Sequence, residues 1–137
     1  MTKVYLMVAG ISGFIAVFMG AVGSHLLMGK LSPEHMAAFN TAVQMQMVHT
    51  LAILSIAFFN RYVGRSFVNT VYYLFLLGIL LFSFPVYLIS TVEVTKISFS
   101  FLSFLPPLGG VAFMLGWIAV FWSGLTYVHH KRGHKHD

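Results

Sequence analysis

Four long apolar stretches constrain the fold of this chain more than any other feature of its sequence. A bilayer core about 30 Å thick needs about 20 apolar residues in each helix that crosses it. The four stretches lie at about residues 4–28, 38–60, 67–90 and 105–128. They predict an all-α, integral membrane four-helix bundle that forms a single transmembrane domain over residues 1–137, with a basic, histidine-rich tail at 129–137.

The composition places these stretches in lipid rather than in a water-soluble core. Of the 137 residues, 58% are hydrophobic and 8% are charged, whereas a soluble domain carries about 25% charged residues. A core built from so short a chain does not hide that much apolar surface from water. Cysteine is absent, which excludes disulfides, thiol catalysis and thiolate metal sites.

The positive charges predict an orientation and argue against a nucleic-acid partner. The net charge is +5, but the basic residues are scattered or gathered at the C-terminus and form no basic face. With four spans, the membrane side that holds both termini carries six basic residues, and the other side carries two, Lys30 and Lys96. The six are Lys3, Arg61, Arg65, Lys131, Arg132 and Lys135. Because loops on the cytoplasmic side are enriched in Lys and Arg, we expect both termini in the cytoplasm.

Small residues in the first and fourth spans predict where helices approach closely. In lipid, close backbone contact replaces the hydrophobic drive for helices to associate. Six glycines are the predicted packing positions: Gly13, Gly20, Gly23, Gly109, Gly110 and Gly116. We expect the first and fourth helices to pack against each other or against another subunit. The alternative is that glycine is simply common in membrane helices.

Polar residues of the second span, within "VQMQMVHTLAIL" (residues 43–54), form the candidate functional site. At 100° per residue, Gln46, His49 and Thr50 share one helical face, and His25 near the end of the first span is a further candidate. One interpretation is a His–His or His–Gln site for a metal, a proton or a polar ligand head. The other is a set of hydrogen bonds between helices.

A second polar face lies on roughly the opposite side of the same helix. An unpaired polar group in the middle of a bilayer costs several kcal/mol, so we expect both faces to contact protein or water. The second helix is therefore expected to be central to the bundle or to contact another chain. The members of this second face are Asn40, Thr41, Gln44 and Ser55.

The spans contain no recognisable catalytic set. The acidic residues Glu34, Glu93 and Asp137 lie outside the spans, and two histidines without a carboxylate make a poor catalytic or metal set. The sequence has no HExxH, Walker or GxSxG motif, so we expect no enzyme and no cofactor. The tail either binds Zn, Cu or Ni weakly or acts as a cationic segment near anionic headgroups; its histidines are His129, His130, His134 and His136.

Two segments between the spans also carry structural predictions. In "LSPEH", Ser32 is the expected N-cap of the second helix, with Pro33 at its first position. The 91–104 connection is long for a bundle of this size. It is either helical, with Phe101, Phe104, Leu105 and Leu108 on one face, or a strand in which Ile97, Phe99 and Phe101 alternate with serines.

Several fragments together resemble the domain of unknown function 423 family, small bacterial inner-membrane proteins related to the mitochondrial transmembrane protein 256 family. These fragments are "GAVGSHLL", "LSPEHMAAFNTAVQMQMVHTLAIL", "LGILLFSFPVYLI" and "PPLGGVAFMLGW". The family patterns match Gly20, Ala21, Gly23, Ser24 and His25, then Phe39, Thr41, Gln46 and His49, then Pro107, Leu108, Gly109 and Gly110. The resemblance thus implies a four-helix membrane fold and no activity.

The chain also departs from this family pattern in three places. Met45 stands where the family usually has Tyr, and Phe84 and Pro85 stand where it usually has a Gly-containing stretch. The loop before Pro106 is longer. The resemblance therefore does not imply, for this chain, a ligand that relies on the tyrosine hydroxyl or on close approach to the third helix.

The function expected from these features is a non-catalytic accessory or scaffolding subunit of the cell inner membrane. Its expected partners are membrane lipids and either a larger membrane protein complex or further copies of itself. The alternative is a protein that binds or transports a small polar or amphipathic ligand, such as a lipid, a quinone or a metal ion. That ligand would occupy the His/Gln site between the first two helices.

Overall fold

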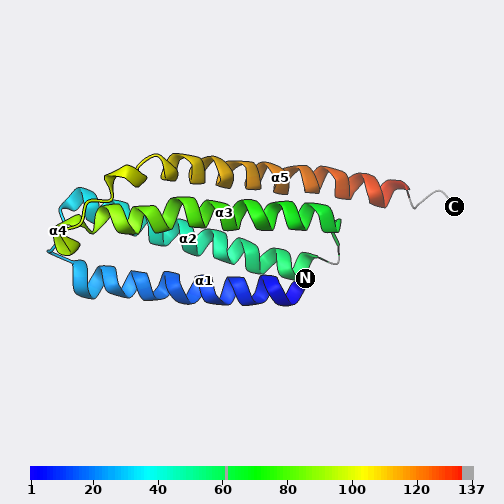
Figure 1. The fold of residues 1–137 in the computed structure, drawn as a ribbon. Helices are drawn as coiled ribbons and strands as arrows, with labels where there is room; N and C mark the ends of the chain where they lie inside the picture. The colour runs from blue at the N-terminus through cyan, green and yellow to red at the C-terminus, as the bar shows by residue number, and fades with distance from the viewer. Residues whose placement is uncertain (61, 134–137) are drawn as a thin grey trace.

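A computed structural model describes the backbone of residues 1–60 and 62–133 and the side chains of residues 1–60 and 62–127. The described chain is helical and contains no strand, which confirms the all-α prediction. Its elements are α1 (Thr2–Val22), a π-helical turn (Gly23–Leu27), α2 (Pro33–Phe59), α3 (Arg65–Ser90), α4 (Val92–Thr95), a 3-10 turn (Ser100–Leu102) and α5 (Leu105–Gly133), as Figure 1 shows.

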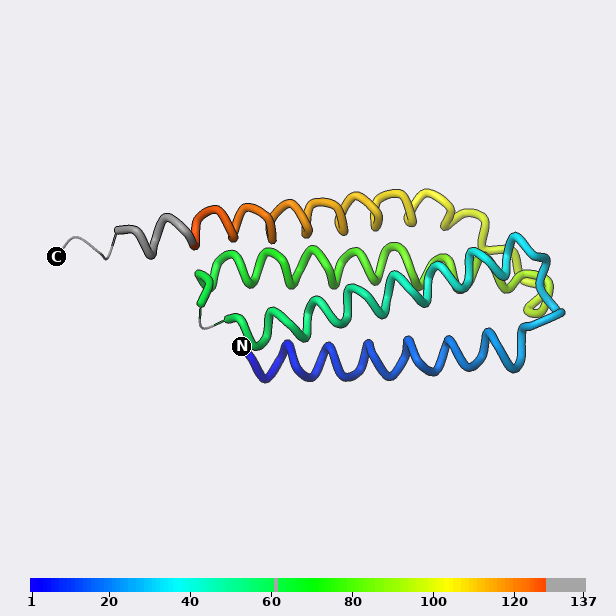
Figure 2. The backbone as a smooth tube through the Cα atoms, turned by 180° about the vertical axis from the view of Figure 1, so that it is seen from behind, coloured from blue at the N-terminus to red at the C-terminus, as the bar shows by residue number. Residues whose placement is uncertain are grey.

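The four long helices run side by side in the order α1, α2, α3 and α5, each packed against the next. Figures 1 and 2 place the α1–α2 and α3–α5 connections at one end of the bundle and the α2–α3 connection at the other. The N-terminus and the last turns of α5 lie at the same end. All four helices are long and apolar enough to cross a membrane.

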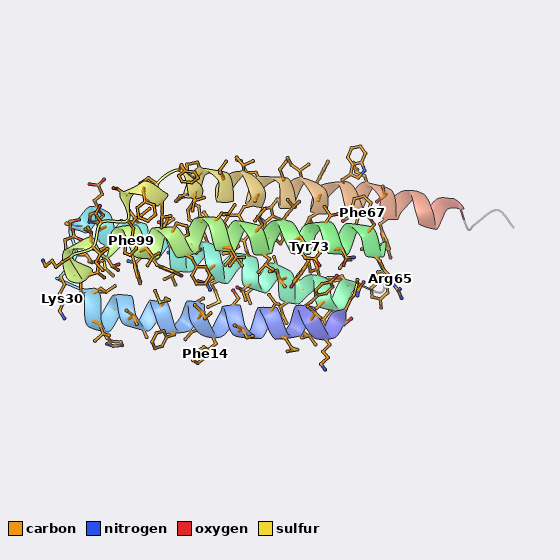
Figure 3. The ribbon with its side chains drawn as sticks, viewed as in Figure 1. Phe14, Lys30, Arg65, Phe67, Tyr73 and Phe99 are labelled. Carbon is orange, nitrogen blue, oxygen red and sulfur yellow. The ribbon has the colours of Figure 1, made fainter. Side chains whose placement is uncertain are left out.

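The outward faces of the long helices are rich in large apolar side chains. Phe14 on α1 is 72% exposed (Figure 3), and Ile11, Phe121 and Trp122 are also exposed. Several polar side chains are instead found inside, among them Gln46, Thr50 and Ser83. This distribution is the reverse of that in a soluble helical bundle, and it fits a bundle whose solvent is lipid.

The start of α2 follows from local chemistry at the α1–α2 turn. Gly29 adopts a positive φ of 79°, which glycine reaches without steric cost. The Ser32 side chain then accepts a hydrogen bond from the His35 backbone N–H, and Pro33 occupies the first helical position. Both parts of the predicted N-cap are confirmed.

Gly13 and Gly20 of α1 and Gly23 of the π-helical turn face α2. A Cβ added at Gly13 would lie 3.5 Å from Thr50, and one added at Gly20 would lie 3.6 Å from Val43. A Cβ at Gly23 would lie 2.9 Å from the Phe39 ring. These three predicted packing positions therefore lie against α2, the next helix along the chain.

The glycines of α5 behave differently from one another, and the two that are tightly packed face α3. A Cβ at Gly109 would lie 2.6 Å from the backbone nitrogen of Phe82, and one at Gly116 would lie 2.5 Å from the Phe75 ring, whereas at Gly110 it would meet nothing within 4 Å. Of the two arrangements expected for the first and fourth helices, direct packing against each other is therefore wrong, and packing against another subunit stays a prediction. Instead α1 packs on α2 and α5 packs on α3, so α2 and α3 lie between α1 and α5.

The 91–104 connection forms neither of the two continuous shapes considered. A single turn of helix, α4, ends at Lys96, which adopts the left-handed conformation with a φ of 59°. The 3-10 turn follows, and no strand forms. The apolar side chains of Phe101, Phe104 and Leu108 are exposed, so this end of the bundle also presents apolar surface.

Candidate functional site

The buried polar face of α2 forms a hydrogen-bonded network that joins three helices. The Gln46 side-chain N–H donates to the Ser12 carbonyl oxygen at 3.1 Å, and the Gln46 carbonyl oxygen accepts from the Tyr87 hydroxyl at 2.7 Å. The hydroxyls of Ser12 and Thr50 lie 2.7 Å apart and share a hydrogen bond. Gln46 is fully buried, so this network connects α1, α2 and α3 in the middle of the bundle.

A further bond ties α3 to α2 one turn away from the glutamine. The Ser83 hydroxyl donates to the Ala42 carbonyl oxygen at 2.9 Å, and Ser83 is fully buried. Ser83 therefore bonds the neighbouring helix rather than a carbonyl of its own helix, as serines in membrane helices often do. The hydroxyl adds a second fixed contact between the central pair of helices.

His49 uses both of its ring nitrogens within the bundle. Its Nδ1 lies 2.6 Å from the Met45 carbonyl oxygen, and its Nε2 lies 3.1 Å from the Trp117 indole nitrogen. A carbonyl only accepts and an indole N–H only donates, so Nδ1 carries the proton and Nε2 is the acceptor. The imidazole is therefore neutral in this arrangement. It links α2 to α5.

Aromatic rings surround the same imidazole. The Phe113 ring stacks on it with centroids 3.6 Å apart and an interplanar angle of 13°. The Phe75 and Trp117 rings approach it with centroids 5.1 Å and 6.0 Å away. Because both of its nitrogens are bonded and the residue is buried, the ring has no free position from which to bind a metal or to exchange a proton in this conformation.

The structure does not bring His25 to this network. His25 is exposed and lies in the π-helical turn at the end of α1. It is 13 residues from Ser12, which corresponds to about 20 Å along the helix. Of the predicted site residues, Gln46 and Thr50 meet through Ser12, His49 faces α5, and His25 stands apart.

Three partners of these groups were not among the predicted site residues: Ser12, Tyr87 and Trp117. Tyrosine and tryptophan count as apolar in a hydropathy pattern, although each has a polar group that seeks a partner when buried. That requirement is the sequence signal that could have identified Tyr87 and Trp117, and the prediction did not use it. Ser12 lay among the small residues of the first span, where it gave no separate signal.

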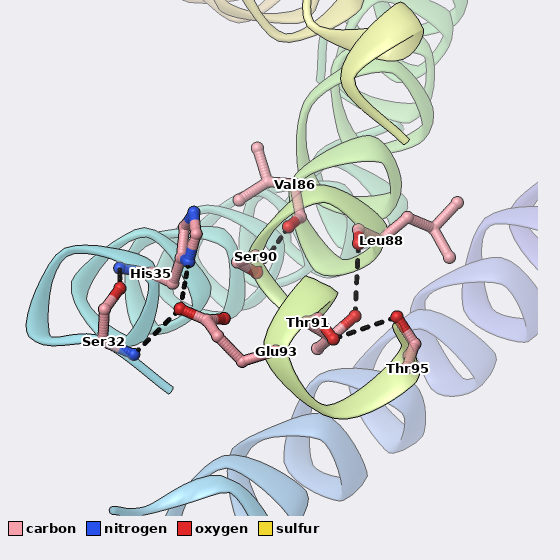
Figure 4. Close-up of polar contacts among 8 residues, drawn as sticks. All are labelled: Ser32, His35, Val86, Leu88, Ser90, Thr91, Glu93 and Thr95. Carbon is pink, nitrogen blue, oxygen red and sulfur yellow. Dashed lines mark hydrogen bonds and ion pairs between the residues drawn. The ribbon is translucent and has the colours of Figure 1, made fainter. Parts of the chain in front are cut away.

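A second polar cluster lies outside the spans, where α4 meets the start of α2. One carboxylate oxygen of Glu93, Oε1, accepts from the Ser32 backbone N–H at 3.1 Å and lies 2.6 Å from Nδ1 of His35. Figure 4 shows both contacts. The hydrogen bond from His35 is the largest of the influences that lower the pKa of Glu93 to about 2.

The described side chains offer no set of ligands for a metal ion. They contain no group of three or more His, Asp and Glu residues placed to hold a metal ion. The four tail histidines considered above lie outside the described side chains: His129, His130, His134 and His136.

Comparison with known proteins places the chain in a family. Residues 19–110 match the family described as "Protein of unknown function (DUF423)". The chain belongs to the DUF423 family. It is 34% identical to the UPF0382 membrane protein YwdK of Bacillus subtilis over 92% of this chain and 99% of the relative. It is also 34% identical to the UPF0382 inner membrane protein YgdD of Escherichia coli over 85% of each chain.

Other relatives extend the same picture. The UPF0382 membrane protein of Haemophilus influenzae is 31% identical over 88% of this chain and 92% of the relative. No solved structure matches the chain. With its four apolar helices, this DUF423 member is a membrane protein. The residues matched to DUF423 include Gln46, His49, Tyr87 and Glu93 but not Trp117.

Proposed function

We propose that this DUF423 protein is a non-catalytic accessory or scaffolding subunit that contacts another membrane protein through the outward face of α2. The observation that carries the proposal is the side chain of Gln44. It is exposed on the side of the bundle and has no hydrogen-bond partner within the described part of the chain. Asn40, one helical turn earlier, is exposed on the same face.

The depth of Gln44 makes its exposure costly in lipid. It lies 11 residues after Pro33 and 15 residues before Phe59, the two ends of α2, or about 16 Å and 22 Å along the axis. A primary amide at that depth without a partner costs several kcal/mol. A neighbouring membrane protein that supplies donors and acceptors removes this cost, so the α2 face is best explained as a contact surface.

The lack of catalysis in this proposal is supported by how the interior polar groups are used. The Gln46 amide is bonded to α1 and α3, and the His49 imidazole is bonded to the Met45 carbonyl of its own helix and to Trp117 on α5. Ligand binding between α1 and α2, the alternative function, requires these bonds to break first. The same groups therefore support a structural role better than a reactive or ligand-binding one.

The proposed location is the cell inner membrane, with both termini in the cytoplasm. The inner-membrane name of the Escherichia coli relative supports the compartment. Lys3 and Arg65 lie at the end of the bundle that holds the N-terminus, and Lys30 and Lys96 belong to the connections at the other end. The remaining positive charges used for the orientation belong to residues whose side chains lie outside the described ranges: Arg61, Lys131, Arg132 and Lys135.

Single cysteines test the contact surface cleanly because the chain has none of its own. Gln44→Cys, labelled with a photoactivatable maleimide in native membranes, is expected to form a defined adduct with one other membrane protein. Phe14→Cys, on the exposed face of α1, is the matched control and is expected to give none. The adduct partner should also co-purify with the unmodified protein in mild detergent.

An apolar substitution completes the test. Gln44→Leu removes the unpaired amide and leaves an ordinary lipid-facing residue, so it is expected to abolish co-purification while the protein stays folded. An adduct between two copies of this chain alone, or co-purification that survives Gln44→Leu, would show that the accessory role at this face is incorrect.

A further inference from the structure

A polar recess lies at the end of the bundle that holds the N-terminus. It has a volume of about 340 Å³ and is lined by residues from the first turn of α1, the end of α2 and the start of α3: Met1, Thr2, Asn60, Arg65 and Asn69. Figure 3 shows Arg65 at this end of the bundle and Lys30 at the opposite end. Because the helices span the membrane, the recess lies at the boundary between lipid and water.

The lining of the recess offers hydrogen-bond donors that are not used within the protein. Arg65 is exposed and forms no hydrogen bond or ion pair with the described residues. The Asn69 carbonyl oxygen accepts from the Tyr5 hydroxyl, which leaves the amide N–H groups of Asn69 without an acceptor in the described chain. Arg65 and Asn69 are four residues apart on α3 and so share one helical face.

The start of α3 strengthens the preference of this recess for an anion. Gly64 is the N-cap residue and supplies no side-chain acceptor to the first turn. Backbone N–H groups at a helix N-terminus carry partial positive charge and commonly bind anions. Here that feature coincides with the Arg65 guanidinium and two amide side chains in one recess.

No acid in the described chain compensates this positive charge. The acidic residues of the described ranges are Glu34 and Glu93, and both lie at the other end of the bundle, where α1 meets α2 and α3 meets α4. The recess therefore combines the free guanidinium of Arg65, the free amide donors of Asn69 and a helix N-terminus, and no carboxylate of the described residues lies near them.

We propose that this recess binds a phosphate group, either from the headgroup of an anionic phospholipid or as free inorganic phosphate. Guanidinium groups bind phosphate oxygens through two parallel hydrogen bonds. The Asn69 amide adds free N–H donors, whereas the Asn60 amide already donates one N–H to the Thr2 hydroxyl at 3.4 Å. The site lies at the membrane boundary, where phospholipid phosphates are found. It does not depend on the proposed accessory role, which uses a different face at mid-membrane.

The binding test uses the full chain purified in a neutral detergent. Native mass spectrometry with dioleoylphosphatidylglycerol is compared with dioleoylglycerol, which has the same acyl chains and no phosphate. The wild-type protein is expected to retain the phosphatidylglycerol at least fivefold more than the phosphate-free lipid. In parallel, 10 mM inorganic phosphate is compared with 10 mM chloride in a thermal unfolding assay, to identify free phosphate as the ligand.

Two variants and one control assign the binding to this recess. Arg65→Gln is expected to lower phosphatidylglycerol retention at least fivefold. Asn69→Asp keeps the acceptor for the Tyr5 hydroxyl and places a carboxylate beside Arg65, so it is expected to lose binding without losing thermal stability. Lys30→Gln removes one charge at the opposite end and is expected to bind like the wild type.

The outcomes separate the two sources of phosphate and the failure of the proposal. Preferential retention of phosphatidylglycerol identifies the lipid headgroup as the ligand, and stabilisation by inorganic phosphate identifies the free anion. Either result supports the site, provided that the Arg65→Gln variant no longer shows that retention or stabilisation. The proposal is overturned if the wild type shows neither effect, if Arg65→Gln binds like the wild type, or if Lys30→Gln loses binding to the same extent.

Discussion

The closest backbone approach at a glycine of this bundle gives a sharp test of its packing, through the pair Gly109→Ala and Gly110→Ala. The two glycines are adjacent in α5 but have opposite surroundings. At Gly109 an added Cβ would lie 2.6 Å from the Phe82 backbone nitrogen and 2.8 Å from the Leu81 carbonyl carbon. At Gly110 it would meet nothing within 4 Å.

The expected difference in the free energy of unfolding is worked out by comparing the two variants with each other rather than each with the wild type. Alanine favours a helix over glycine by about 1 kcal/mol at either position, so this contribution cancels in the difference. What remains is the steric cost at Gly109. Non-bonded carbon atoms rest about 3.5–4.0 Å apart, so α5 has to move away from the α3 backbone by about 1 Å. Overpacking of this kind costs about 1–3 kcal/mol. Because the neighbour is backbone and cannot rotate away, the cost at Gly109 is expected near the upper end of this range.

The assay is reversible unfolding of each variant in mixed micelles of a mild detergent and dodecyl sulfate, followed by circular dichroism. Gly109→Ala is expected to be less stable than Gly110→Ala by about 2–3 kcal/mol. Gly110→Ala should match or slightly exceed the wild type. Equal stabilities for the two alanine variants would show that α5 does not contact α3 at Gly109 as the structure places it.

Three further substitutions test the polar contacts. Tyr87→Phe leaves the carbonyl oxygen of Gln46 without one donor and is expected to lower the free energy of unfolding by about 0.5–2 kcal/mol in the same micelle assay. Trp117→Phe keeps an aromatic ring but removes the indole N–H that His49 accepts; we expect a loss of about 1 kcal/mol, and no loss would place the indole elsewhere. The pKa of Glu93 is lowered from its ordinary 4.5 to about 2, so its ionised form stabilises the fold above pH 4.5, and this contribution is lost as the pH falls toward 2. A scan of unfolding temperature between pH 7 and 2 should therefore show a decline in the wild type that is weaker in Glu93→Gln, and parallel curves would contradict the contact.

The sequence predicted the spans and one helix start well because both depend on local chemistry. Length and hydropathy determine whether a segment crosses a bilayer, and the four predicted stretches correspond to the four long helices. The N-cap at Ser32 followed from the side chain and the proline beside it. Neither prediction required knowledge of which helices are neighbours.

Helix neighbours could not be predicted in the same way. Glycines in α1 and α5 indicated close packing, but a spacing of three and four marks a face without naming its partner. The same limit applied to His25, which was grouped with His49 because both are histidines. His25 lies about 20 Å along the helix from Ser12, the α1 residue of the buried network. Which groups meet depends on how the helices are staggered and rotated, and those quantities are set by side-chain packing over the whole bundle.

The contrast between two glutamines of α2 supports the proposal that this protein contacts another membrane protein. Gln44 and Gln46 have the same side chain and nearly the same depth, so the cost of placing either amide in lipid is similar. Gln46 recovers that cost through bonds to Ser12 and Tyr87, whereas Gln44 has none in the described chain. The fold satisfies the Gln46 amide fully but exposes the Gln44 amide, which lies two residues away. A neighbouring protein that supplies the missing hydrogen bonds accounts for this difference.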